Sequence, residues 1–262
     1  MTEGLKSRKI LLLGSGFVAG PCLNYLAQNK NYSITVASLV QSESEALCKP
    51  YPDNTHATEV NIGEESSLHP LVSDHEIVIS LVPYTFHLKV LDACVKYKKH
   101  MVTTSYISEA MQEQNERVKD AGITVLNEIG LDPGIDHLYA VKTIDEVHKK
   151  SGKILEFISY CGGLPSPQSN DNPMGYKFSW SSKGVLLALM NTATYLKDNK
   201  LVTVDGGIDL MDCEEKIDIV DDLVTVGYPN RDSTVYKGKY EIPECNTCLR
   251  GTLRYKVIHY YC

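Results

Sequence analysis

The sequence predicts an α/β protein that begins with a Rossmann-type, doubly wound parallel sheet. Short apolar runs alternate with segments of helical period as far as residue 130. A glycine-rich turn, Gly14-Ser15-Gly16-Phe17-Val18-Ala19, separates the first apolar run from the first helix. A chain of 262 residues with 43% hydrophobic residues can build two cores. We therefore expect two domains, at residues 1–134 and 135–262.

The strands of the first domain are expected where apolar residues form short runs. These runs are residues 9–13, 33–37, 57–62, 77–82, 101–104 and 123–126. The run at 77–82 is continuous, as expected of a strand that is buried on both faces. Helical periodicity predicts helices at residues 18–28, 43–47, 87–97 and 108–119, a short polar helix before residue 77, and a further helix from about His137.

The glycine turn has the spacing of a dinucleotide-binding motif. Gly14 permits the tight turn, Gly16 lets the backbone approach a pyrophosphate, and the small Ala19 lets the helix pack closely on the strand. The amino end of the helix then faces the anion. After the second strand, an acidic residue would favour NAD and an arginine NADP. This chain has Ser38-Leu39-Val40 there, so the choice between NADP and NAD stays open.

Composition excludes several classes of function. A net charge of −7 argues against a general nucleic-acid surface. No window has the apolar length of a membrane helix, and the polar start at residues 1–6 is unlike a signal peptide, so we expect a cytoplasmic protein without membrane partners. The cysteines are expected to be reduced. Cys245 and Cys248 have CxxC spacing without a second pair of ligands, so we expect no metal.

Polar side chains gather after the later strands. Residues 130–137, GLDPGIDH, combine two carboxylates with an imidazole, although an aspartate before a helix also acts as a cap. Ser105-Tyr106 and Pro83-Tyr84 follow strands, at the carboxyl edge where doubly wound sheets bind ligands. Two late loops carry arginines, which bind carboxylates through paired hydrogen bonds or are simply solvated.

Together, these motifs resemble a known family. The segments LLLGSGFVA, ISLVPYTFH, VTTSYIS, GITVLNEIGLDPGIDHLYAVKTID, SYCGGLPSP, NPMGYKFSWSS, GYPNRDST and LRGTLRY, in this order, resemble saccharopine dehydrogenase of the glutamate-forming type, also called saccharopine reductase. The resemblance runs from about Lys9 to Tyr255. It implies lysine metabolism through aminoadipate: glutamate joins aminoadipate semialdehyde, and the imine is reduced to saccharopine with NADPH or NADH, or the reverse.

The resemblance also assigns roles to residues. Tyr106, Asp132 and Cys161 would lie around the reacting carbon. The cofactor would contact Gly14, Ser15, Gly16, Phe17, Val18, Ser38, Asn61, Ile62, Val82 and Ser105. Saccharopine, which carries three carboxylates, would be bound by Ser105, Tyr106, Asp132, Arg231, Thr252, Leu253 and Arg254.

The sequence departs from the family in specific places. Leu39 and Val40 stand where fungal members have an arginine and animal members an acidic residue, and Asn61 stands where relatives have aspartate. Family members continue beyond the arginine motif, whereas residues 256–262 resemble nothing in the family, so we expect an incomplete α/β substrate and dimerisation domain. A homodimer is then expected only if this domain is intact. The alternative function is a catalytically silent form that keeps dinucleotide binding or acts as an interaction protein.

Overall fold

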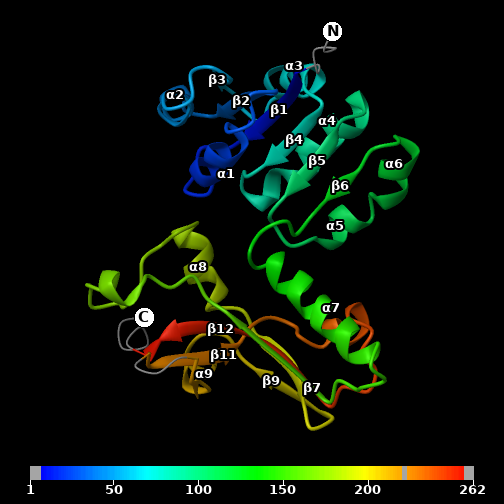
Figure 1. Cartoon of the computed structure of the whole chain (residues 1–262), viewed down its shortest axis with the longest axis vertical. Helices are drawn as coiled ribbons and strands as arrows, with labels where there is room; N and C mark the ends of the chain where they lie inside the picture. Colours follow the sequence, from blue (N-terminus) through cyan, green and yellow to red (C-terminus); the bar gives the residue numbers. More distant parts are fainter. Residues whose placement is uncertain (1–6, 220–222, 257–262) are drawn as a thin grey trace. The chain divides into compact units, whose positions relative to one another are not determined.

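The computed structural model describes residues 7–219 and 223–256. The polar start at 1–6 and the end of the tail that the sequence singles out, at 257–262, lie outside the described residues. The chain divides into two compact units, of which the first ends at Ile135 and the second begins at Asp136 (Figure 1). The sequence placed this boundary one residue earlier.

The first unit is a parallel, doubly wound sheet, as predicted. Its strands are β1 (Arg8–Leu13), β2 (Tyr32–Ser38), β3 (Thr55–Glu59), β4 (Ile77–Ser80), β5 (His100–Thr103) and β6 (Val125–Leu126), in the order β3-β2-β1-β4-β5-β6. The helices are α1 (Ala19–Leu26), α2 (Gln41–Cys48), α3 (Glu65–Asp74), η1 (Tyr84–Phe86), α4 (His87–Tyr97), α5 (Glu109–Gln112) and α6 (Asn115–Asp120).

The central strand β1 supplies both cores of this unit. Successive strand residues point to opposite faces. Leu11 and Leu13 accordingly pack with α3 and α4, whereas Ile10 and Leu12 pack with α1 and α2. All four are buried. Helices therefore cover both faces of the sheet, and the carboxyl ends of its strands are left to carry the loops.

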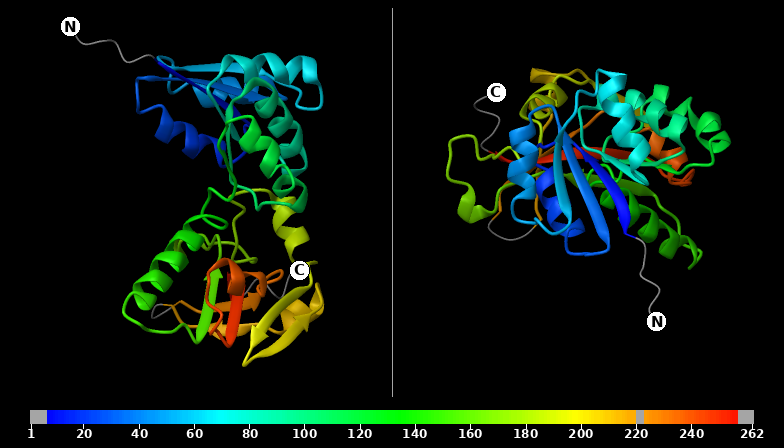
Figure 2. Two further views of the ribbon diagram at one scale, coloured as in Figure 1. Left: turned by 90° about the vertical axis from the view of Figure 1, so that its right-hand side faces the viewer. Right: turned by 90° about the horizontal axis from the view of Figure 1, so that it is seen from above.

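The second unit is built on a mixed sheet. Its strands are β7 (Glu156–Cys161), β8 (Ala193–Lys197), β9 (Lys200–Val204), β10 (Glu215–Ile217), β11 (Thr225–Pro229) and β12 (Thr247–Tyr255), in the order β10-β11-β12-β8-β9, and β7 pairs with β12 in parallel. The helices are α7 (Ile135–His148), η2 (Pro167–Ser169), α8 (Ser182–Ala188), α9 (Ile208–Asp212) and α10 (Val235–Lys239). Figure 2 shows the yellow β8–β9 hairpin at the edge of this sheet.

Two glycines let an aromatic ring lie across the middle of the second sheet. A Cβ on Gly227 of β11 or on Gly251 of β12 would come within 2.5 or 2.3 Å of the Tyr160 ring. Tyr160 is paired with Gly251 across the β7–β12 ladder. The ring therefore occupies space that any larger residue at these positions would need, and it holds β7 in register with β12.

One predicted helix differs from the structure. The charged segment 108–119 forms two short helices, α5 and α6, which are interrupted at Glu113 and Gln114. Ser108 caps the start of α5 by accepting a hydrogen bond from the backbone N–H of Met111. A charged, exposed face carries no sign of such a break. None of the helices in the described part of the chain has the length and hydrophobicity needed to cross a membrane.

Candidate active site

The glycine turn in the first unit has the geometry that a dinucleotide needs. Gly14 has φ +109°, and a Cβ there would lie 3.0 Å from the Leu81 carbonyl oxygen. A Cβ on Gly16, in contrast, would meet nothing within 4 Å. Packing therefore requires glycine at position 14 but not at 16, which leaves close approach of a ligand as the reason for the second glycine. Phe17 and Val18 are exposed beside it.

The segment after β2 carries acidic rather than basic side chains. Glu43, in the first turn of α2, accepts a hydrogen bond from the Ser15 hydroxyl of the glycine turn. The Ser38 side chain is buried, and its hydroxyl lies 2.7 Å from that of Ser44 and donates to the Val40 carbonyl. From Ser38 to Cys48 there is no lysine or arginine.

The residues expected beside the adenine and the nicotinamide have roles of their own in the fold. The Asn61 side chain accepts from the backbone N–H of Gly63 and donates to Glu64, so it shapes the turn before α3. Ile62 and Val82 are partly buried against the core under α3 and α4. These contacts fix the loops at the sheet edge where the cofactor is expected.

Tyr106 and Asp132 meet in the first unit. The Tyr106 hydroxyl donates a hydrogen bond of 2.5 Å to Asp132 Oδ1. Tyr106 lies in the loop after β5, at the carboxyl edge of the sheet. Asp132 lies in a tight loop that closes where the Ile135 N–H donates to the Gly130 carbonyl. A Cβ on Gly134 would lie 2.0 Å from that carbonyl oxygen, so only glycine fits there.

Three other expected groups, Cys161, Thr252 and Arg254, lie in the second unit, on one face of its sheet. Cys161, at the end of β7, is paired with Thr252 of β12. Residues two apart on a strand share a face, so Cys161 lies beside Thr252 on the face that also carries Arg254. Leu253 is on the opposite face. A Cβ on Gly162 would lie 2.1 Å from the Leu253 carbonyl oxygen, which explains why glycine follows Cys161.

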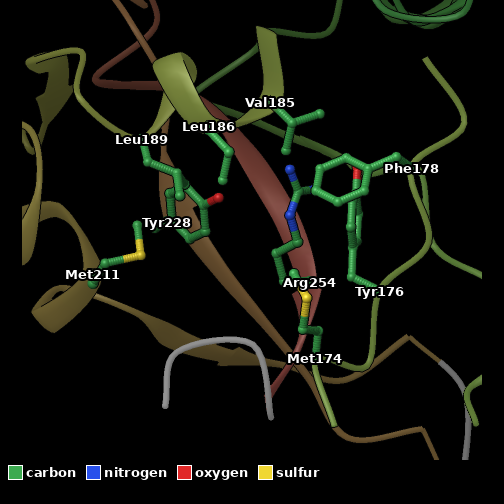
Figure 3. Close-up of a pocket in the computed structure, with 9 residues that line it drawn as sticks. All are labelled: Met174, Tyr176, Phe178, Val185, Leu186, Leu189, Met211, Tyr228 and Arg254. Atoms are coloured by element: carbon green, nitrogen blue, oxygen red, sulfur yellow. The ribbon is translucent and has the colours of Figure 1, made fainter. Parts of the chain in front are cut away.

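Arg254 is a buried cation. Only 7% of it is exposed, and it stacks 4.9 Å from the centre of the Tyr176 ring and donates to the Leu253 carbonyl. Within the described residues it has no carboxylate partner. Figure 3 shows its guanidinium in a pocket lined by Met174, Tyr176, Phe178, Val185, Leu186, Leu189, Met211 and Tyr228. A charge held in such surroundings is costly unless an anion joins it.

Arg231 lies at a different position along the strands of this sheet than Arg254. It follows β11, and its backbone is left-handed with φ 55°, which is uncommon outside glycine. The neighbouring Asn230 N–H donates to the Arg250 carbonyl. Arg231 therefore belongs near the Arg250 end of β12, four residues or about 13 Å from Arg254 along the strand.

A buried ion pair joins α7 to β12. Asp136, in the first turn of α7, accepts from Arg250, and Arg250 also donates a 2.6 Å hydrogen bond to the Tyr236 hydroxyl. His137 Nδ1 lies 2.6 Å from the Tyr240 hydroxyl. The second carboxylate of the GLDPGIDH segment thus anchors the helix, while the first, Asp132, meets Tyr106.

Comparison with known proteins gives one family for both units. Residues 10–126 match the saccharopine dehydrogenase NADP binding domain, and residues 130–262 match the saccharopine dehydrogenase C-terminal domain. The chain belongs to the saccharopine dehydrogenase family.

Relatives in this family are similar over nearly the whole chain. The saccharopine dehydrogenases [NADP(+), L-glutamate-forming] of Schizosaccharomyces pombe and Saccharomyces cerevisiae are 53% and 52% identical over 94% and 95% of this chain, which covers 54% and 55% of theirs. The apo structure of the Saccharomyces cerevisiae enzyme superimposes with a TM-score of 0.88 at 51% identity, over 96% of this chain and 56% of that one. The resemblance and the fold class predicted from the sequence are confirmed, and the chain spans about half the length of these relatives.

Three residues of this saccharopine dehydrogenase homologue contact the expected site but were not predicted from the sequence. Glu43 reaches the glycine turn, His87 contacts Ser105, and Glu128 accepts from the backbone N–H of Ile107. His87 stands in the motif ISLVPYTFH, directly after a strand, which was the available signal. Glu43 and Glu128 give no such signal, because isolated glutamates are common on surfaces. The described residues contain no group of His, Cys, Asp or Glu side chains arranged to hold a metal.

Proposed function

We propose that this chain interconverts saccharopine with aminoadipate semialdehyde and L-glutamate, using a nicotinamide dinucleotide. The observation that carries the proposal is the Tyr106–Asp132 hydrogen bond at the carboxyl edge of the dinucleotide-binding sheet. Hydrolysis of an imine passes through a carbinolamine, whose oxygen and nitrogen must exchange protons. A tyrosine hydroxyl bonded to a carboxylate can donate and accept such protons.

The residues around the glycine turn fit a bound dinucleotide. The space in front of Gly16 and the amino end of α1 suit a pyrophosphate. The bound nicotinamide supplies or accepts the hydride. Because the relatives are NADP(+)-dependent by name, NADP is the proposed cofactor, and NAD is the alternative that the acidic segment after β2 supports. Gly14, Ser15, Phe17, Val18, Ser38, Asn61, Ile62, Val82 and Ser105 are the further proposed contacts.

The two arginines would bind different carboxylates of saccharopine. Arg254, buried without a carboxylate partner among the described residues, would hold one. Arg231 lies about 13 Å from Arg254 along the strand, so it would bind a different carboxylate of saccharopine. Thr252 and the backbone of Leu253 would border the first of these carboxylates, and the Cys161 thiol would be a polar neighbour, since hydride transfer to an imine needs no covalent intermediate with the enzyme.

The test is turnover of saccharopine by the purified chain, followed by the absorbance of the reduced nicotinamide, with NADP and NAD in parallel. A rise with either cofactor supports the proposal. Asp132→Asn keeps the size of the side chain but cannot take up a proton, and it should lower kcat by about 100-fold or more while dinucleotide binding is unchanged. Undiminished turnover in this variant contradicts the assigned chemistry.

The same experiment tests the alternative. A folded sample that binds dinucleotide but turns over no saccharopine would be the catalytically silent form. We further propose that saccharopine and its products are the small-molecule partners, that two copies pair through the second unit, and that the protein is cytoplasmic without nucleic-acid or membrane partners. Sedimentation of the purified chain tests the pairing, and fractionation of cells tests the location.

A further inference from the structure

His87 lies at the point where three elements of the first unit converge. It begins α4, directly after the η1 turn, and only 3% of the residue is exposed. Its Nδ1 is 3.1 Å from the Ser80 hydroxyl at the end of β4. Its Nε2 is 2.8 Å from the Ser105 hydroxyl and 2.9 Å from the Thr103 hydroxyl at the end of β5. Both ring nitrogens are thus bonded to hydroxyls.

The imidazole is uncharged at neutral pH. Burial lowers the pKa of His87 to about 4. A neutral ring has one N–H donor and one acceptor nitrogen, so it determines which neighbouring hydroxyls accept a hydrogen bond from the ring and which donate one to it. Ser105 is the only one of the three hydroxyl residues that is also among the proposed cofactor and substrate contacts.

The loop after β5 is held on both sides of Tyr106. Before Tyr106, the Ser105 hydroxyl bonds to His87, and the Ser105 carbonyl accepts from the Glu128 N–H at 3.1 Å. After Tyr106, the Ile107 N–H donates a hydrogen bond of 3.0 Å to the Glu128 carboxylate. Removing either support would let Tyr106 move relative to Asp132.

We propose that His87 is a positioning residue that holds the Ser105–Tyr106 segment so that the Tyr106 hydroxyl meets Asp132. The inference rests on the proposed function for its catalytic consequence, but the Tyr106–Asp132 contact itself can be measured without turnover. His87 touches neither of the two reacting groups and acts only through Ser105 and the backbone.

Two substitutions separate the ring nitrogens. In His87→Gln the side-chain amide reaches the place of Nε2 and keeps a polar partner for Ser105. In His87→Asn the shorter amide takes the place of Nδ1, so it keeps the Ser80 contact and loses Ser105. We expect kcat to fall about 10- to 100-fold in His87→Asn, with dinucleotide binding unchanged and with recovery of most activity in His87→Gln.

The matched control is His75, a second buried histidine that is bonded through both nitrogens. Its Nδ1 is 2.6 Å from the Leu71 carbonyl and its Nε2 is 2.7 Å from the Thr35 hydroxyl. These contacts join α3 to β2. His75→Asn should therefore lower the melting temperature but leave kcat unchanged. If His75→Asn and His87→Asn lower kcat alike, the role of His87 is only structural and the proposal is wrong.

A measurement independent of activity uses tyrosine labelled with carbon-13 at Cζ, with the Tyr106 signal assigned by Tyr106→Phe. In His87→Asn this signal should shift in the same direction as in Asp132→Asn, and in His87→Gln it should stay at the wild-type position. A signal unmoved in His87→Asn overturns the proposal, whether or not the chain turns over saccharopine. Absence of turnover in the wild type together with the expected shifts would reject only the proposed function.

Discussion

Arg250 and Arg254 lie on the same face of β12, but their charges are balanced differently. Arg250 is paired with the Asp136 carboxylate and bonded to Tyr236. Arg254 is equally buried, yet its contacts within the described residues are a carbonyl oxygen and an aromatic ring. A fold that needed Arg254 only for packing would do better with an apolar side chain, so the charge indicates a ligand.

The two arginines should therefore respond in opposite ways to the same substitution. Arg250→Met removes the guanidinium that is paired with the buried Asp136 carboxylate, and we expect the free energy of unfolding to fall by about 3 to 5 kcal/mol. Arg254→Met removes an unbalanced charge and should leave the stability unchanged or raise it. The KM of Arg254→Met for saccharopine should rise about 100-fold, because the charge-assisted, paired hydrogen bond to a substrate carboxylate is lost. Urea unfolding followed by Trp180 fluorescence and steady-state kinetics measure the two effects.

A loss of stability in Arg254→Met as large as in Arg250→Met would mean that Arg254 is structural, and the carboxylate site would have to be elsewhere. Arg254→Lys keeps the charge but not the fork of two parallel donors. It should bind saccharopine with an intermediate KM.

His87 should make the stability of the first unit depend on pH. Because its pKa in the folded protein is about 4, against 6.5 ordinarily, the unfolded chain takes up a proton between these values and the folded chain does not. The free energy of unfolding therefore falls as the pH falls through this window. Between pH 7 and pH 5 the fall should be about 2 kcal/mol smaller in His87→Gln than in the wild type. Urea unfolding followed by circular dichroism measures it, and equal slopes would show that the pKa of His87 is the same in the folded protein as in the unfolded chain.

At the scale of elements, we expect the β2–α2 connection to influence which dinucleotide is bound. Leu39 is 66% exposed, and Glu43 places a carboxylate against the glycine turn. We expect Leu39→Arg to improve the binding of NADP relative to NAD by about 10-fold, since an arginine can pair with the 2′-phosphate. Glu43→Gln should act in the same direction by removing a repulsive charge. The effect is reported by the ratio of the dissociation constants of NADP and NAD, each measured by fluorescence quenching or by titration calorimetry.

The control for this substitution is Leu201→Arg, because Leu201 is 67% exposed in the second unit and far along the chain from the glycine turn. A similar change of the ratio in that variant would indicate only the added positive charge. No change in Leu39→Arg would mean that the 2′-phosphate is bound elsewhere.

Elements that are encoded by a pattern of consecutive residues were predicted well, whereas contacts between residues far apart in the chain were not. The strand at 77–82 and the helix at 87–97 lie where the apolar pattern placed them, because burial on both faces and helical period are written in consecutive residues. The pairing of Cys161 with Thr252 could not be predicted, since it depends on a register between strands that are far apart in the chain. The bond from His87 to Ser105 was hidden for the same reason.

At the scale of the whole molecule, each unit has its own cores, and the single tryptophan, Trp180, reports only on the second. A dinucleotide bound at Gly14–Val18 should therefore stabilise the first unit alone, by about 2.7 kcal/mol at 100 times its dissociation constant. We expect saturating dinucleotide to raise the thermal midpoint measured by circular dichroism and to leave the Trp180 fluorescence midpoint unchanged, whereas saccharopine should raise the latter through Arg254. If the dinucleotide raises both midpoints equally, the two units unfold as one cooperative body and the expectation is wrong.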